Sequence, residues 1–100
     1  MATHQVKITV LDGDFSYSHN PLRVDPGDSI EWLCDAGPFA VHLGWGTPCS
    51  KGRVRAGKGQ KVGTAVRANA PNGTFKYMVA VNVDGDIYTD DPEIVVKPQT

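Results

Sequence analysis

Hydrophobic and polar side chains alternate along most of this chain, which is the pattern of β-strands that bury one face. The longest alternating stretch is residues 74–83, where Phe75, Tyr77 and Val79 fall on one side and Met78 falls on the other. Turn-forming pairs such as Asp-Gly and Pro-Gly separate the alternating stretches. We therefore predict short strands over residues 5–11, 22–24, 29–34, 39–45, 62–66, 74–83, 87–89 and 94–97, and a long loop over residues 46–61.

The residue usage supports strands over helices. Val and Ile together number 16, whereas Leu and Met together number 6 and there are only 2 Glu. β-branched side chains suit a pleated sheet, and the 11 Gly and 7 Pro are spread along the chain as turn residues. The chain is predicted to be all-β, a two-sheet sandwich of about eight short strands forming a single domain over residues 1–100.

Charge and hydropathy exclude several classes of partner. The formal net charge is -1, which gives no overall attraction to nucleic acid or to anionic lipid. No run of apolar residues approaches the length of about 20 that a membrane helix needs. The N-terminal residues have no basic start followed by an apolar stretch, so we expect a soluble cytoplasmic protein, with a periplasmic or secreted mature form left open.

Three stretches of the sequence resemble the cupredoxin family. Residues 22–32 (LRVDPGDSIEW) are similar to the family's strand, Pro-Gly-Asp turn and following strand. Residues 35–42 (DAGPFAVH) are similar to the segment that ends in its first copper-binding histidine, and residues 73–79 (GTFKYMV) to the strand that delivers its copper-binding cysteine. The resemblance implies a cupredoxin-like Greek-key sandwich.

The same resemblance assigns positions to a blue-copper site, which uses two histidines, a thiolate and a weak axial methionine. His42 stands at the first histidine, but Val79 stands at the cysteine and Asn82 at the second histidine. The axial methionine would lie near Ile87, where the chain has none. Because aliphatic carbons cannot replace a thiolate, we predict a metal-free member of this scaffold with no cofactor and no electron-transfer role.

Two cysteines keep a second hypothesis open. Cys34 lies on a predicted inward face and is expected to be a buried free thiol, while Cys49 lies in the predicted loop. Together with His42 they form the alternative candidate metal or redox site, although their spacing matches no zinc motif. The sequence does not decide whether the two thiols are free, bridged or metal-bound.

The charged residues are segregated along the chain. Residues 51–67 contain six basic residues and no acid, and residues 84–93 contain five acids and no base. The basic residues are Lys51, Arg53, Arg55, Lys58, Lys61 and Arg67, and the acids are Asp84, Asp86, Asp90, Asp91 and Glu93. These patches are either ordinary solvated surface that neutralises itself, a docking surface for an acidic partner, or complementary surfaces of a self-assembling structural protein.

We favour a non-catalytic interaction module that docks a protein partner through residues 45–61, because no catalytic motif is present. Arginine side chains present forked donors to carboxylates, and tryptophan is a frequent anchor at interfaces. Trp45 has a second interpretation, as a core residue at the end of an inward strand face. The predicted partner-binding residues are Trp45, Lys51, Arg53, Arg55, Lys58 and Lys61.

Overall fold

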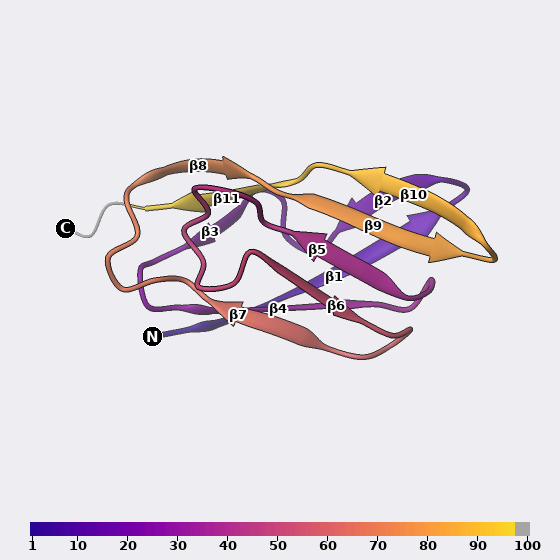
Figure 1. The fold of residues 1–100 in the computed structure, drawn as a ribbon, viewed down its shortest axis with the longest axis horizontal. Coiled ribbons are helices and arrows are strands. Elements are labelled where there is room, and N and C mark those ends of the chain that lie inside the picture. The colour runs from indigo at the N-terminus through magenta and orange to yellow at the C-terminus, as the bar shows by residue number, and fades with distance from the viewer. Residues whose placement is uncertain (98–100) are drawn as a thin grey trace.

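The computed structural model describes residues 1–97, in which every regular element is a β-strand (Figure 1). Residues 98–100, the end of the expected single domain, lie outside the described residues. Hydrogen bonds group the eleven strands of the described part into three sheets. None of these residues forms a helix that could cross a membrane.

The first sheet has the order β2 (Asp14–Tyr17), β1 (Thr3–Leu11), β4 (Ser29–Cys34) and β7 (Val62–Ala65). The second has the order β10 (Asp86–Asp90), β9 (Met78–Val83), β5 (Phe39–His42) and β6 (Arg53–Ala56). The third has the order β3 (Leu22–Val24), β11 (Glu93–Val96) and β8 (Gly73–Lys76).

The three sheets make two layers. The second and third sheets follow one another, because β8 leads directly into β9 and β10 leads into β11 (Figure 1). The first sheet packs against them, and the inward side chains of all three form one buried core. At one edge of the sandwich, the Tyr17 hydroxyl of β2 donates to the Asp90 carboxylate of β10 at 2.8 Å.

Strand alternation decides which side chains enter the core. Along β5 and β9 the inward residues Phe39, Val41, Val79 and Val81 are at most 4% exposed. Trp32 of β4 is completely buried between the layers, and its indole N–H donates to the Tyr77 hydroxyl at 3.3 Å. The predicted all-β sandwich is therefore confirmed.

The number and grouping of strands differ from the expectation of about eight strands in two sheets. The predicted strand over residues 74–83 is two strands in two sheets, because the chain changes partners at Tyr77, whose amide donates to the Pro92 carbonyl. The predicted loop over residues 46–61 contains β6, which pairs with β5. β2 was not predicted, and it pairs with β1 across a tight turn formed by Asp12 and Gly13, both at positive φ.

Asp28 anchors the start of β1 to the turn before β4. Its buried carboxylate accepts hydrogen bonds from the Ala2 and Asp25 amides, each at 2.9 Å, and pairs with the His4 ring at 2.8 Å. Burial alone would raise the pKa of Asp28, but the hydrogen bonds from His4, Ala2 and Asp25 outweigh it and lower that pKa to about 2.

This network predicts a specific loss of stability in acid. A carboxylate whose folded pKa is depressed stabilises the fold above its unfolded pKa, and that contribution disappears as the pH falls toward the folded value. Asp28→Asn should therefore lower the free energy of unfolding at neutral pH by about 1–2 kcal/mol and should flatten its pH dependence between about pH 5 and pH 2. Urea unfolding at several pH values measures both effects.

Asp25→Asn is the matched control, because Asp25 is an exposed carboxylate in the same turn. If Asp28→Asn and Asp25→Asn show the same acid profile as the unmodified chain, the anchoring role of Asp28 is wrong.

Candidate functional site

The outer face of the second sheet carries the side chains that alternation excludes from the core. His42 of β5 is opposite Arg53 of β6 on one side and opposite Met78 of β9 on the other. The next row across the sheet contains Arg55, Ala40, Ala80 and Thr89 in that order. A basic strand, β6, therefore borders a flat centre of small and apolar side chains.

Trp45 projects from the loop that joins β5 to β6 and is completely exposed to solvent. It stands between Gly44 and Gly46, whose φ angles of +78° and +72° suit glycine and would strain other residues. A Cβ atom added at either glycine would meet nothing within 4 Å, so the tip of the loop stands free of the rest of the molecule. The interpretation of Trp45 as a core residue is therefore wrong.

Hydrogen bonds fix both ends of the loop that carries Trp45. On one side, the Leu43 and Gly44 amides both donate to the Gly52 carbonyl, at 2.7 and 3.1 Å. On the other side, the Arg67 guanidinium donates to the Thr47 carbonyl, and the Arg67 amide donates to the Pro48 carbonyl. The exposure of Trp45 is thus held in place by backbone contacts at the base of its loop.

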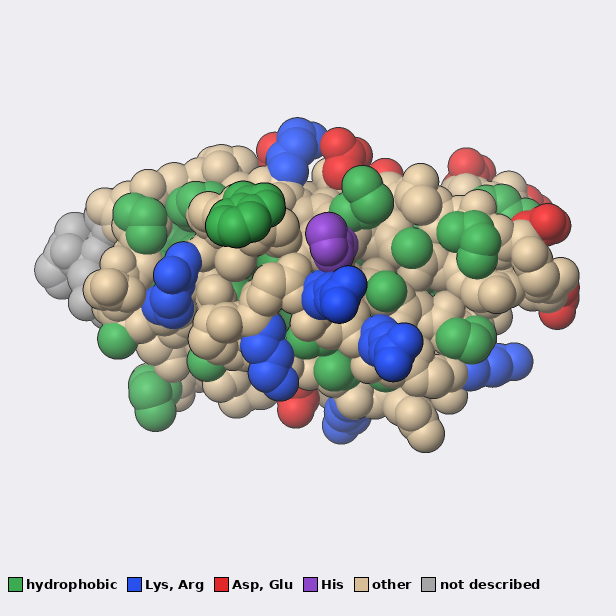
Figure 2. Space-filling view, viewed as in Figure 1, with side chains coloured by type: hydrophobic (Ala, Val, Ile, Leu, Met, Phe, Trp, Pro, Cys, Tyr) green, Lys and Arg blue, Asp and Glu red, His purple; other side chains and the backbone are tan. Residues whose placement is uncertain are grey.

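Cations surround the surface below Trp45. One shallow hollow is lined by His42, Trp45, Lys51 and Arg53 among others, and a second is lined by His42, Lys51, Arg53 and Arg55. Neither hollow has an acidic residue among its described lining residues. Figure 2 shows this gathering of basic side chains and one histidine over β5 and β6, with a large hydrophobic side chain beside it.

The structure divides the predicted partner-binding residues into two groups. Trp45, Lys51 and Arg53 line one hollow, and Arg55 continues the same outer face along β6. Lys58 and Lys61 are exposed at the turn between β6 and β7, beyond the other end of β6, and line neither hollow. His42 and Met78 belong to the face but were not among the predicted partner-binding residues.

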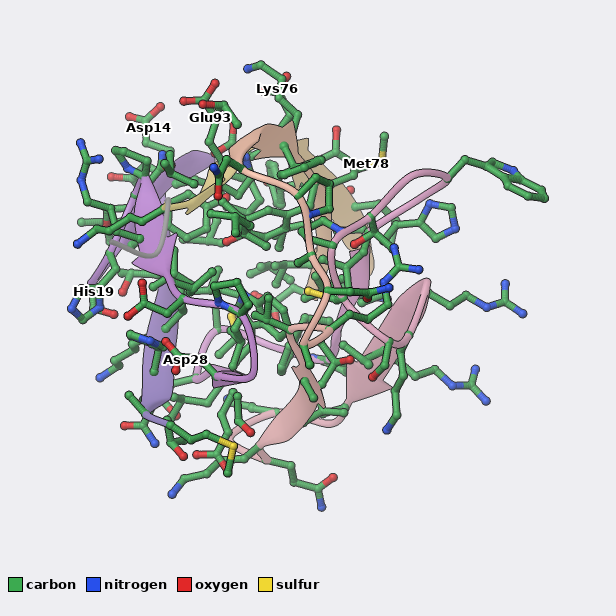
Figure 3. The ribbon with its side chains drawn as sticks, turned by 90° about the vertical axis from the view of Figure 1, so that its left-hand side faces the viewer. Asp14, His19, Asp28, Lys76, Met78 and Glu93 are labelled. Carbon is green, nitrogen blue, oxygen red and sulfur yellow. The ribbon has the colours of Figure 1, made fainter. Side chains whose placement is uncertain are left out.

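The acidic stretch follows the far edge of the same sheet and continues into the third sheet. β10 forms the edge opposite β6, and Asp91 lines a shallow depression there with Met78, Thr89 and Asp90. The ion pairs in the described residues do not join the acidic stretch to the basic stretch. Asp91 and Glu93 instead pair with Lys76, at 3.5 and 3.9 Å, at the edge where Figure 3 shows Lys76 and Glu93 together.

The residues of the alternative metal or redox site do not come together. Cys34 and Cys49 are free thiols buried in the core, whereas His42 lies on the exposed face of β5. Burial also raises the pKa of the Cys49 thiol, which disfavours the thiolate that binds metals. Residues 1–97 contain no group of three or more His, Cys, Asp or Glu side chains placed to hold a metal ion.

Comparison with known proteins identifies the fold. No family model matches the chain, and no curated protein matches it by sequence. A purple cupredoxin from Nitrosopumilus maritimus matches with a TM-score of 0.62 and 16% identity, covering 94% of this chain and 99% of that chain. Two amicyanin variants, one in a reduced Cu(I) form and one oxidized, give TM-scores of 0.55 and 0.56 at 14% and 15% identity. Each comparison covers 93% of this chain and 82% of the amicyanin chain.

These matches confirm the cupredoxin-like fold that the sequence resemblance implies. Copper is the metal that this fold suggests, and the residues at the corresponding positions do not fit it. His42 faces solvent, whereas Val79 is fully buried on the opposite side of the sheet. Asn82 accepts a hydrogen bond from the Gly85 amide at 2.9 Å and pairs with Ile87. Among the four positions that the sequence resemblance assigns to copper ligands, only His42 has a metal-ligating side chain, and this set does not match the trigonal site of a blue-copper protein.

The two tryptophans should respond in opposite ways to mutation. Trp45→Ala should change the free energy of unfolding by less than about 0.5 kcal/mol, because the indole makes no packing contact. Trp32→Ala should cost about 3–5 kcal/mol, since it opens a cavity between the layers and removes the hydrogen bond to Tyr77. Chemical denaturation measures both changes, and a destabilising Trp45→Ala would show that Trp45 has a structural role.

Proposed function

We propose that this chain is a non-catalytic, metal-free docking module on a cupredoxin-like scaffold, and that it binds an acidic protein surface. Its docking face consists of His42, Trp45, Lys51, Arg53 and Arg55. The observation that carries the proposal is the full exposure of Trp45 on a loop whose two ends are fixed by hydrogen bonds.

An exposed tryptophan forgoes the roughly 2–3 kcal/mol that burial of a large apolar side chain contributes to stability. Trp45 has no packing role that offsets this cost, whereas Trp32 occupies the core of the same chain. Tryptophan and arginine are the residues most often found at the energetic centre of protein interfaces, and Trp45 stands beside Arg53 in one hollow. Burial of the Trp45 side chain on binding would contribute the hydrophobic stabilisation that folding does not provide.

The charges near Trp45 favour an acidic partner. Arg53 and Arg55 are exposed two residues apart on one face of β6, so their side chains leave the strand on the same side, with Cα atoms about 6–7 Å apart. Two parallel guanidinium forks suit carboxylates on an opposing surface. A basic patch on a chain of net charge -1 also favours local docking over general attraction to polyanions.

A glutamate-rich peptide with a central leucine provides the test, because it offers carboxylates around one apolar side chain. Arg53→Glu/Arg55→Glu should weaken its binding at least about tenfold, as should Trp45→Ala, and added salt should weaken binding to the unmodified chain. Isothermal titration calorimetry measures the affinities, and the indole N–H signal of Trp45 reports direct contact.

Lys58→Glu/Lys61→Glu is the matched control, since it makes the same change in net charge outside the docking face. Equal weakening by both double variants would mean that net charge alone governs binding and would contradict the proposed face. Tighter binding of a thymidine oligonucleotide than of the peptide would contradict an acidic protein as the partner.

A further inference from the structure

The docking face continues across the second sheet to one acidic residue at the far edge. In one row the order across the strands is Arg53, His42 and Met78, and Asp91 lies beside Met78 at the far edge. This row thus begins at a cation on β6 and ends at an acid just beyond β10. Asp91 is the acid on the outer surface here, because Asp86 and Asp90 lie on the inward side of β10. The outer surface therefore has cations along one edge and a single carboxylate, Asp91, at the other.

The centre of this outer surface is flat and partly apolar. Ala40 and Ala80 are opposite each other in the middle of the sheet, and they leave little more than backbone to approach. Met78 is 51% exposed and Ile87 is 62% exposed on the same outer surface. Small central residues with exposed apolar neighbours allow a second sheet to pack at the usual separation of about 10 Å.

We propose that the docking face binds a second copy of this chain in a two-fold symmetric, face-to-face dimer. This inference rests on the proposed docking function and names its partner. The two-fold axis runs parallel to the strands, between β5 and β9. Rotation about that axis places β6 of each copy over β10 of the other, so that the cations of each copy face the edge of the other that ends in Asp91.

The strand register makes the match specific to individual residues. Because rotation about an axis along the strands keeps each row at the same height, Arg53 faces Asp91 of the second copy. His42 faces Met78 of the second copy, and Arg55 faces its Thr89. The interface is isologous, meaning that each contact occurs twice, and the assembly therefore closes at two copies.

The ion pairs already present at the acidic edge do not oppose this arrangement. Asp91 pairs with Lys76 at 3.5 Å, but both side chains are more than 60% exposed, and such surface pairs contribute little. Asp90 is directed inward to the Tyr17 hydroxyl and remains a structural residue. Asp91 is thus the carboxylate available to the second copy.

The area available sets the strength of the dimer. Four strands spaced about 4.8 Å apart and about five residues long present a flat footprint of roughly 300 Å² before the Trp45 loop is added. That size belongs to weak and transient interfaces, well below the roughly 800 Å² per partner of a standard interface. The rotation also keeps the Trp45 loops of both copies at one end of the interface, where they enlarge the contact.

Sedimentation velocity over protein concentrations from about 10 μM to about 1 mM tests the proposal. The unmodified chain should form dimers at the upper end of this range, and higher salt should reduce the dimer fraction. Arg53→Glu/Arg55→Glu should remain monomeric, because the glutamates introduced on β6 then face Asp91 of the second copy. Thr89→Lys/Asp91→Lys should also remain monomeric, because two basic edges then face each other.

An equimolar mixture of these two double variants is the decisive sample. The introduced glutamates face the introduced lysines at one edge, and unmodified Arg53 and Arg55 face Asp91 and Thr89 at the other. The mixture should therefore recover dimers that neither variant forms alone, while Lys58→Glu/Lys61→Glu should dimerise like the unmodified chain.

Three results would overturn the proposal. They are a chain that stays monomeric at about 1 mM, dimers that persist in both double variants, and a species that grows beyond two copies with concentration. If the chain stays monomeric and yet binds the glutamate-rich peptide through Trp45, the docking function stands and only the second copy as partner is wrong. If neither self-association nor peptide binding is found, the docking function itself is contradicted.

Discussion

The antiparallel pairing of β5 with β9 is the constraint on which the rest of this molecule depends. It places Val41 beside Val79 and Phe39 beside Val81, and these four side chains seal the middle of the core. Successive side chains of a strand point to opposite faces, so the same pairing forces His42, Met78 and their neighbours outward. The β5–β9 register therefore decides both which side chains pack in the core and which lie on the outer surface of the sheet.

The same register bears on the copper site that a cupredoxin-like fold suggests. A cupredoxin-like sandwich is present. The position that the sequence resemblance assigns to the copper-binding cysteine is a core valine that faces away from His42. The β9–β10 hairpin, which turns at Asp84 and Gly85, continues the sheet through Asn82 and Ile87. The sequence resemblance assigns these positions to the second histidine and the axial methionine. The surface so created is flat in the middle and has cations along β6, and the proposed docking function rests on these features.

Much of this architecture could be predicted from hydrophobic alternation. β3 and β4 have the predicted limits. Alternation could not reveal the change of sheet at Tyr77, because that side chain is inward in the pattern and buried in the fold. It also missed β6, since a four-residue edge strand with two arginines resembles a polar loop.

The candidate site shows a different limit. Trp45 continues the alternation that puts Phe39 and Val41 on the inward face, and this favoured a core position. The strand ends at His42, however, and alternation does not predict side-chain direction beyond the end of a strand. The glycines on either side of Trp45 were the local signal of this break, since both adopt positive φ. The separate basic and acidic stretches could be seen in the sequence. That β6 and β10 form opposite edges of one sheet could be known only from the strand order.

The central claim is that the outer face of the β10–β9–β5–β6 sheet is where this chain meets another protein. Amide and indole chemical shifts recorded over a dilution series test it most directly, because they locate contact residue by residue. The account predicts concentration-dependent shifts at the Trp45 indole and along β5, β6, β9 and β10, with the first sheet unchanged. Shifts confined to the first sheet, or a Trp45 indole that responds neither to dilution nor to added glutamate-rich peptide, would contradict it.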